Sequence, residues 1–115
     1  MKKILIAEHS SVIAESLAEI LRRKYIVFTR RGDCLSAALE SIRPDVLIVD
    51  IALIGIDGLL KLRSTAYTPP VLFIVTNILT EQLLLAAQDV GADYIARFPF
   101  SLDTMARRLD DLLGK

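Results

Sequence analysis

Residues 46–50 read Val-Leu-Ile-Val-Asp, a continuous apolar run that leads directly into a carboxylate. Such a run is too short for a helix and is typical of a strand that is buried on both faces of a sheet. Apolar or β-branched runs predict four more strands, at residues 4–7, 25–29, 71–75 and 94–97. The run at 94–97 is less apolar than the others, so we expect it at an edge of the sheet.

Amphipathic stretches between these runs predict helices. Small polar residues are suited to cap four of them, namely Ser10 or Ser11, Asp33, Thr80 and Ser101. Helical spacing predicts three inward-facing sets: Ile13, Leu17, Ile20 and Leu21; Leu35, Ala38, Leu39 and Ile42; and Leu102, Met105, Leu109, Leu112 and Leu113. Pro44 and Gly91 are expected to end two helices, and residues 51–58 are expected to form a loop before a weaker helix at 59–64. Strands that alternate with helices in this way predict an α/β domain with a parallel sheet.

Length and composition limit the class of protein. The chain has 115 residues, 53% of them hydrophobic, which predicts a single domain over residues 1–115. Its 14 basic and 14 acidic residues balance, which argues against direct binding to nucleic acid or to an anionic membrane. No apolar run approaches the roughly 18 residues that a membrane span needs. The single cysteine, Cys34, cannot form an internal disulfide, so we expect an inert thiol and a cytoplasmic protein.

Polar residues follow the predicted strands at the edge where open α/β sheets form their sites. These residues are Glu8-His9, Asp50, Thr76 and Arg97-Phe98. Two carboxylates and a hydroxyl that converge there suit a hard cation such as Mg²⁺, with a carboxylate as nucleophile toward phosphorus. Taken alone, an aspartate in the position of Asp50 more often caps a helix or forms a turn after a buried strand. A histidine in the position of His9 more often bonds the backbone at a helix start than binds a metal or senses pH.

Several other sites are excluded by missing motifs. The sequence has no G-x-x-x-x-G-K-[ST] or G-x-G-x-x-G loop to hold a nucleotide phosphate and no G-x-S-x-G elbow. One histidine and one cysteine cannot build a Cys/His zinc site. A small flavin or nucleotide enzyme on the same fold is therefore the weakest of the alternatives.

Six motifs occur in a fixed order along the chain. They are Glu8-His9 after the first strand, Leu-Ile-Val-Asp at 47–50, Gly-Ile-Asp-Gly at 55–58, Val75-Thr76, Gly-Ala-Asp at 91–93, and Phe-Pro-Phe at 98–100. In this order and spacing they resemble the receiver domains of bacterial response regulators, the CheY-like superfamily, from end to end. The resemblance implies a flavodoxin-like (βα)5 fold, doubly wound, with a five-stranded parallel sheet in the order 2-1-3-4-5.

The resemblance also implies a function in two-component signalling. Asp50 would accept a phosphoryl group, Thr76 would bind a phosphoryl oxygen, and Mg²⁺ would be held by Glu8, Asp50 and the backbone carbonyl of Ala52. The donor would be a sensor histidine kinase or a phosphotransfer protein. A downstream protein, or a second copy in a homodimer, would bind the face of the fourth helix, fifth strand and fifth helix. No enzyme activity is expected beyond self-phosphorylation and slow dephosphorylation of Asp50. Dephosphorylation should be slow because Ala52 and Ile78 stand at the positions that tune loss of the phosphoryl group in the family, and neither can orient an attacking water.

The chain departs from the family pattern at five positions, which makes it an atypical member, and the mildest departure is Glu8, a methylene longer than the usual aspartate. His9 replaces the second acidic metal ligand and leaves a weakened Mg²⁺ site, and Phe98 replaces the lysine that contacts the phosphoryl group. Ile95 stands at the aromatic switch position and Ile54 at the usual proline. Arg97 could replace the lysine if the strand end shifted by one residue, and Pro99 is compatible with a cis bond after Phe98. Two interpretations remain: a working phospho-acceptor, and a pseudo-receiver that binds partners without phosphorylation.

Overall fold

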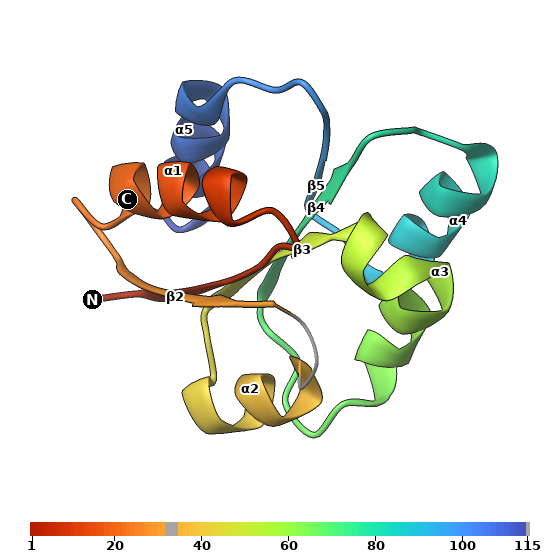
Figure 1. The fold of residues 1–115 in the computed structure, drawn as a ribbon. Helices are drawn as coiled ribbons and strands as arrows, with labels where there is room; N and C mark the ends of the chain where they lie inside the picture. The colour runs from red at the N-terminus through yellow and green to blue at the C-terminus, as the bar shows by residue number, and fades with distance from the viewer. Residues whose placement is uncertain (32–34, 115) are drawn as a thin grey trace.

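A computed structural model describes residues 1–31 and 35–114, and within these the backbone forms a five-stranded parallel sheet (Figure 1). The strands are β1 (Lys3–Ala7), β2 (Ile26–Arg30), β3 (Val46–Asp50), β4 (Val71–Thr76) and β5 (Tyr94–Arg97). Their order, β2-β1-β3-β4-β5, confirms the predicted arrangement, and β5 lies at an edge as expected. This order places the ends of β1, β3 and β4 side by side.

Helices cover both faces of the sheet (Figure 1). They are α1 (Ser11–Leu21), α2 (Leu35–Ile42), α3 (Ile51–Lys61), the short 3-10 helix η1 (Leu62–Ser64), α4 (Glu81–Val90) and α5 (Leu102–Leu112). One apolar cluster joins α1 and α5 to one face of the sheet, and a second joins α2, α3 and α4 to the other. No helix in the described ranges is both long enough and apolar enough to span a membrane.

Helix caps follow the sequence closely. The side chains of Ser10, Thr80 and Ser101 each accept a hydrogen bond from a backbone N–H in the first turn of α1, α4 and α5. Gly91 ends α4 in the left-handed conformation, with φ 74°. The predicted cap Asp33 lies outside the described residues, as does Cys34. The peptide bond before Pro99 is cis.

The predicted loop at residues 51–58 is wrong, because helix α3 begins at Ile51, directly after β3. Asp50 makes this start possible, since its side chain accepts a hydrogen bond from the backbone N–H of Ala52 at 2.9 Å. The helix is interrupted by a kink at Gly55, where φ is 68° and ψ is 175°. The weaker helix expected at 59–64 is the end of α3 followed by η1.

The predicted inward faces are mostly correct. The set on α2 is buried throughout, but the buried stripe of α1 consists of Ala14, Leu17, Ala18 and Leu21. These four positions follow the i, i+3, i+4, i+7 pattern, so the predicted Ile13 and Ile20 lie at its margins and are only partly covered. On α5 the prediction for Leu112 is wrong. Its side chain is 41% exposed, because the covered stripe follows i, i+4, i+8 spacing and Leu112 falls beside it.

Candidate functional site

Three polar side chains are buried in the described part of the chain, and all three lie at the carboxyl edge of the sheet. Glu8 follows β1, Asp50 ends β3 and Thr76 ends β4, with exposed fractions of 4%, 5% and 5%. Asp50 pairs with Val75 in the register of the sheet, so Thr76 lies one residue beyond it on the neighbouring strand. Burial of polar groups at this edge agrees with the general location of sites in open α/β sheets.

His9 lies between the two buried carboxylates. Its Nδ1 contacts Asp50 Oδ2 and lies 3.1 Å from Glu8 Oε1. The chain bends at His9 directly after β1, which brings two consecutive side chains to the same place although successive residues of a strand face opposite ways. The three potential ligand atoms lie within 4.8 Å of one another. The pocket therefore consists of two carboxylates that surround an imidazole.

Backbone N–H groups donate hydrogen bonds to both carboxylates, to the Asp50 oxygen that faces away from His9 and to the Glu8 oxygen that faces it. Asp50 Oδ1 accepts from Ala52 N at 2.9 Å, and Glu8 Oε1 accepts from Ser10 N at 3.2 Å. Asp50 thereby caps the N-terminus of α3, where the helix dipole favours negative charge. A fixed, charged carboxylate at this position is suited to act as a nucleophile.

Protonation divides the two carboxyl groups. Burial, and then the hydrogen bond with Asp50, raise the pKa of Glu8 to about 7. Burial alone would raise the pKa of Asp50, but hydrogen bonds from Glu8, the Ala52 N–H and His9 outweigh it and lower that pKa. The hydrogen bond to Asp50 raises the pKa of His9. Asp50 is consequently the ionised member of the pair near neutral pH, while Glu8, with a pKa of about 7, is partly protonated there.

Thr76 faces a neighbouring cavity and makes its hydrogen bonds within its own loop. Its Oγ1 donates to Ile78 O at 2.9 Å and accepts from Ile78 N at 3.3 Å. The cavity measures about 250 Å³, and its lining includes Ala52, Thr76, Asn77 and Ile78. Sequence reasoning missed Asn77, although a polar residue directly after β4 was the same signal that identified Thr76.

The remaining predicted positions lie apart from the carboxylates. Phe98 is 44% exposed and packs edge-on against Phe100, with ring centroids 5.8 Å apart. The register of β4 and β5 continues unbroken to Thr76 and Arg97, so the shift that would bring Arg97 into the lysine position is not found. Ile95 packs, half-buried, against the cluster beneath α2, α3 and α4.

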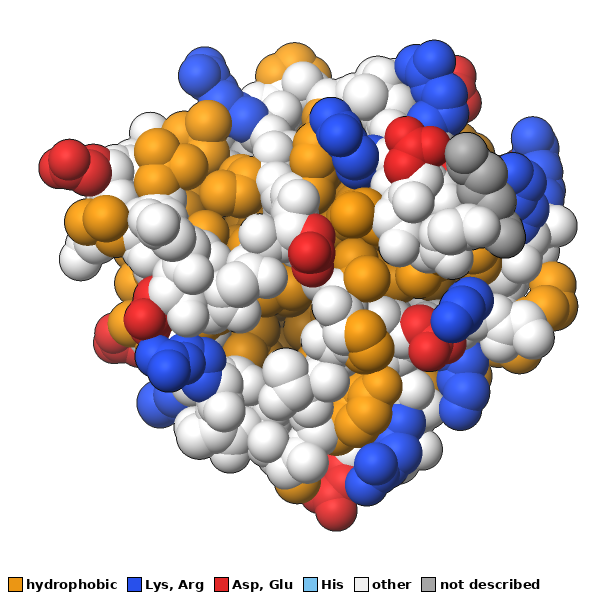
Figure 2. All heavy atoms as spheres, turned by 180° about the vertical axis from the view of Figure 1, so that it is seen from behind, with side chains coloured by type: hydrophobic (Ala, Val, Ile, Leu, Met, Phe, Trp, Pro, Cys, Tyr) orange, Lys and Arg blue, Asp and Glu red, His pale blue; other side chains and the backbone are white. Residues whose placement is uncertain are grey.

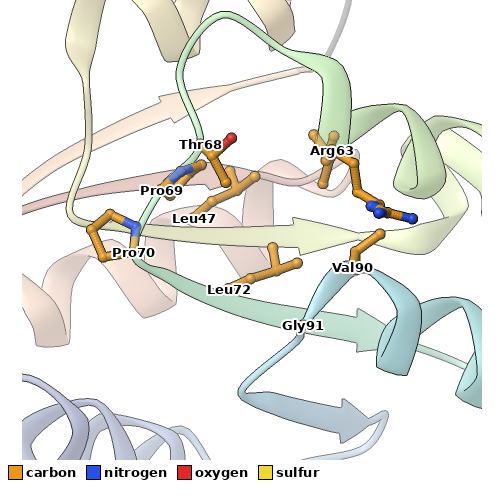
Figure 3. A pocket seen from close by; sticks show the side chains of 9 residues that line it. Leu47, Arg63, Thr68, Pro69, Pro70, Leu72, Val90 and Gly91 are labelled. Carbon is orange, nitrogen blue, oxygen red and sulfur yellow. The ribbon is translucent and has the colours of Figure 1, made fainter.

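Two further cavities lie at opposite edges of the sheet. One of about 300 Å³ adjoins Glu8 and is lined also by Arg30, the last residue of β2, and by Arg31, a basic pair that sequence reasoning missed. Another of about 260 Å³ lies at the opposite, amino-terminal edge of the sheet beside Pro69 and Pro70 (Figure 3). Its lining is largely apolar, and its arginine, Arg63, is paired with Asp89 at 2.9 Å. This second cavity offers no chemistry related to the carboxylate pocket.

Comparison with known proteins agrees with the geometry. The probable transcriptional regulatory protein TcrX of Mycobacterium tuberculosis is 34% identical over 117 residues, covering 97% of this chain and 50% of that protein. The chain spans one third to about half of the length of the first curated relatives that it matches. No family model matches the chain.

Solved structures share the fold. The signal receiver domain of a response regulator from Bermanella marisrubri has a TM-score of 0.81 and 24% identity, covering 96% of this chain and 97% of that one. The BeF3-activated receiver domain of RstA from Klebsiella pneumoniae has a TM-score of 0.80 and 19% identity, covering 98% and 99%. The chain therefore shares the fold of these receiver domains, and over 97% of its length its sequence is similar to that of a transcriptional regulatory protein.

Proposed function

We propose that this chain is a receiver domain that accepts a phosphoryl group on Asp50 and transmits the signal through protein contacts. The observation that carries the proposal is the state of Asp50. Its carboxylate is buried at the end of β3, its pKa is lowered, and one of its oxygens is fixed by the Ala52 N–H at the start of α3. The same fold in receiver domains of response regulators supports it.

In the proposed reaction, an oxygen of Asp50 attacks the phosphorus of a phosphohistidine on a sensor kinase or phosphotransfer protein. The P–N bond breaks, its electron pair stays with the histidine, and an acyl phosphate forms on Asp50. Thr76 would turn its hydroxyl from Ile78 O to a phosphoryl oxygen. Phosphoryl transfer depends mainly on positioning and electrostatics, so no further reacting group is required.

The pocket fits Mg²⁺ poorly. Glu8, Asp50 and the Ala52 carbonyl offer oxygen donors, which Mg²⁺ prefers in near-ideal octahedral geometry. However, the His9 ring contacts the Asp50 oxygen that would face the ion, and the pKa of Glu8 is raised to about 7. A weakened Mg²⁺ site was the prediction from sequence, and no step of the proposed reaction passes through that ion.

The output surface is proposed on the α4 side of the molecule. Ile78, Leu79, Leu84 and Leu85 are exposed hydrophobic residues on α4 and the loop before it. Apolar side chains that remain exposed together are typical of protein-binding surfaces. On the face shown in Figure 2, acidic and basic side chains are interspersed, in agreement with a protein partner rather than a polyanion. A cytoplasmic location and a homodimer remain predictions.

Intact-protein mass after incubation with acetyl phosphate tests the proposal. We expect a gain of one phosphoryl group that is lost in Asp50→Ala and kept in Asp57→Ala, because Asp57 is exposed on α3. Each protein is incubated with EDTA, with Mg²⁺ and with Mn²⁺. A wild-type protein that gains no mass under any of these conditions is a pseudo-receiver, and the proposal is then wrong.

The same samples test the expected slow dephosphorylation. Ala52 and Ile78 line the cavity beside Thr76, and neither side chain can orient a water for attack on the acyl phosphate. After the donor is removed, we expect the added mass to persist for minutes or longer. Decay within seconds, without a phosphatase, would contradict this expectation and would implicate Asn77 as the residue that orients the water.

A further inference from the structure

We propose that Glu8, His9 and Asp50 form a binding site for a divalent first-row transition metal ion, in which His9 Nδ1 sets the preference over Mg²⁺. The site deepens the proposed function, since it lies in the proposed phosphorylation pocket. Its donor set of one nitrogen and two carboxylate oxygens differs from both a Cys/His site and an all-oxygen site. Imidazole suits zinc, iron and nickel, whereas Mg²⁺ takes oxygen donors.

The spacing of the donors matches coordination of a single ion. Two ligands that are each about 2.1 Å from an ion lie roughly 3.0 to 3.4 Å apart at octahedral or tetrahedral angles. Glu8 Oε1 and His9 Nδ1 are 3.1 Å apart, so this pair needs no rearrangement. Asp50 Oδ2 lies against the same Nδ1, and a small outward movement of the imidazole would admit the ion among the three atoms.

Charge and burial also indicate a cation. Glu8 and Asp50 are more than nine-tenths buried, and in the described chain their ion pairs are made with His9 alone. Buried carboxylates are stable only when they are paired, hydrogen-bonded or bound to a metal. An ion at this point would face both carboxylates at once. The half-exposed His9 side chain leaves the site open to solvent on one side, where water or a phosphoryl oxygen can complete the coordination.

The site should distinguish Zn²⁺ from Mg²⁺ by the type of donor atom, the His9 nitrogen, rather than by the size of the ion. His9 is the only histidine in the sequence, so any imidazole ligand must come from this residue. An aspartate in its place would give a third carboxylate and an all-oxygen set. The relative affinity for Zn²⁺ and Mg²⁺ should therefore depend on this one side chain.

The test uses untagged protein with Cys34→Ser, so that His9 is the only soft ligand left apart from the methionines. Zn²⁺ and Mg²⁺ are titrated separately by calorimetry, and the ring nitrogens of His9 are followed by ¹H–¹⁵N NMR. We expect Zn²⁺ to shift the ring signals at stoichiometric concentration and Mg²⁺ to leave them unchanged at the same concentration.

Two variants complete the test. In His9→Asp, the ratio of Zn²⁺ to Mg²⁺ affinity should fall about tenfold or more, because the nitrogen donor is lost and an oxygen donor is gained. In Asp57→Asn, an exposed acidic control on α3, the ratio should not change.

Ring signals that Zn²⁺ does not move, or the same affinity ratio in wild type and His9→Asp, would overturn the proposal. The imidazole would then serve as a fixed neutralising group between the carboxylates. Acetyl phosphate labelling separates this result from the proposed function. A protein that binds Zn²⁺ through His9 but is never phosphorylated contradicts only the function, and one that is phosphorylated without Zn²⁺ binding contradicts only the metal site.

Discussion

Glu8 makes the stability of the fold depend on pH. Its pKa is about 7 in the folded protein, against 4.5 for an ordinary glutamate, so the folded state binds this proton more tightly than the unfolded state. The resulting stabilisation is fully present below the unfolded pKa and is lost as the pH rises through the folded one. The raised pKa of His9 acts in the same direction, while the lowered pKa of Asp50 acts oppositely and only in acid.

We therefore expect the metal-free protein to lose stability between about pH 5 and about pH 8, by an amount on the order of 1–3 kcal/mol. Urea unfolding in EDTA at several pH values measures it. Glu8→Gln should remove most of the slope, whereas Glu19→Gln, at an exposed position of α1, should leave it intact. Equal slopes in wild type and Glu8→Gln would show that Glu8 titrates normally.

Phe98 is the second residue whose replacement should be informative. Its backbone N–H donates to Thr76 O at 2.7 Å, so its side chain starts beside the end of β4, but the ring cannot donate a hydrogen bond to a phosphoryl group. Phe98→Lys should speed labelling by acetyl phosphate, by up to about 10²-fold if the amine reaches the transferred group. Arg97→Ala should leave the rate unchanged, and a slower rate in that variant would show that Arg97 already replaces the lysine.

Single residues show both the success and the limit of prediction from sequence. Glu8, Asp50 and Thr76 were predictable, because each is polar and directly follows an apolar strand. The place of His9 between the carboxylates was not predictable, since it depends on the bend after β1. The sequence also did not predict that Thr76 lines a cavity beside the carboxylates and that its hydroxyl donates a hydrogen bond to Ile78 O within its own loop.

At the level of the elements, two glycines with positive φ should respond differently to substitution. Gly55 has φ 68° and ψ 175°, a region that is essentially restricted to glycine, whereas Gly91 has φ 74° and ψ 41°, which asparagine tolerates. A Cβ at either position would meet nothing within 4 Å, so any cost is conformational.

We expect Gly55→Asn to lower the free energy of unfolding by about 1–3 kcal/mol and Gly91→Asn by less than about 1 kcal/mol. Urea denaturation of both variants at one pH measures the difference. Equal losses would mean that the kink in α3 relaxes in the variant and is not required by the fold.

The wrong prediction of a loop at residues 51–58 also comes from the conformational freedom of glycine. Two glycines and Asp57 within eight residues indicated a loop, yet one of these glycines only kinks a helix that Asp50 has already started. A sequence pattern cannot distinguish a glycine that ends a helix from one that bends it, because both need the same conformational freedom. The caps at Ser10, Thr80 and Ser101 were predictable because each precedes a long amphipathic stretch.

For the whole molecule, the contact between the N-terminal part of the chain and helix α5 can be tested at Tyr25. The hydroxyl of Tyr25 donates to Asp110 Oδ1 on α5, and Lys24 Nζ lies 2.8 Å from the other oxygen of that carboxylate. Tyr25 is largely buried whereas Lys24 is exposed, so the hydroxyl should matter more. Tyr25→Phe should lower the free energy of unfolding by about 1 kcal/mol, and Lys24→Met by about 0–0.5 kcal/mol. Thermal unfolding measures both, and a larger loss in Lys24→Met would contradict this ranking.

The overall architecture was the most predictable level. Alternation of apolar runs and amphipathic stretches indicated a parallel sheet with two covered faces, and the family resemblance supplied the order of the strands. The exposed apolar residues before and on α4 could not be separated from core residues by sequence alone, because Leu83, Leu84 and Leu85 are consecutive and only Leu83 is buried.

The kink at Gly55 has a mechanical consequence. A straight helix acts as a rigid lever, so a force applied at its first turn displaces its far end. In α3 the first turn is attached to Asp50, but the backbone leaves the helical path at Gly55, and the lever is cut after a single turn. We therefore expect a displacement at Asp50 to move the first turn of α3 more than the part of the helix beyond Gly55.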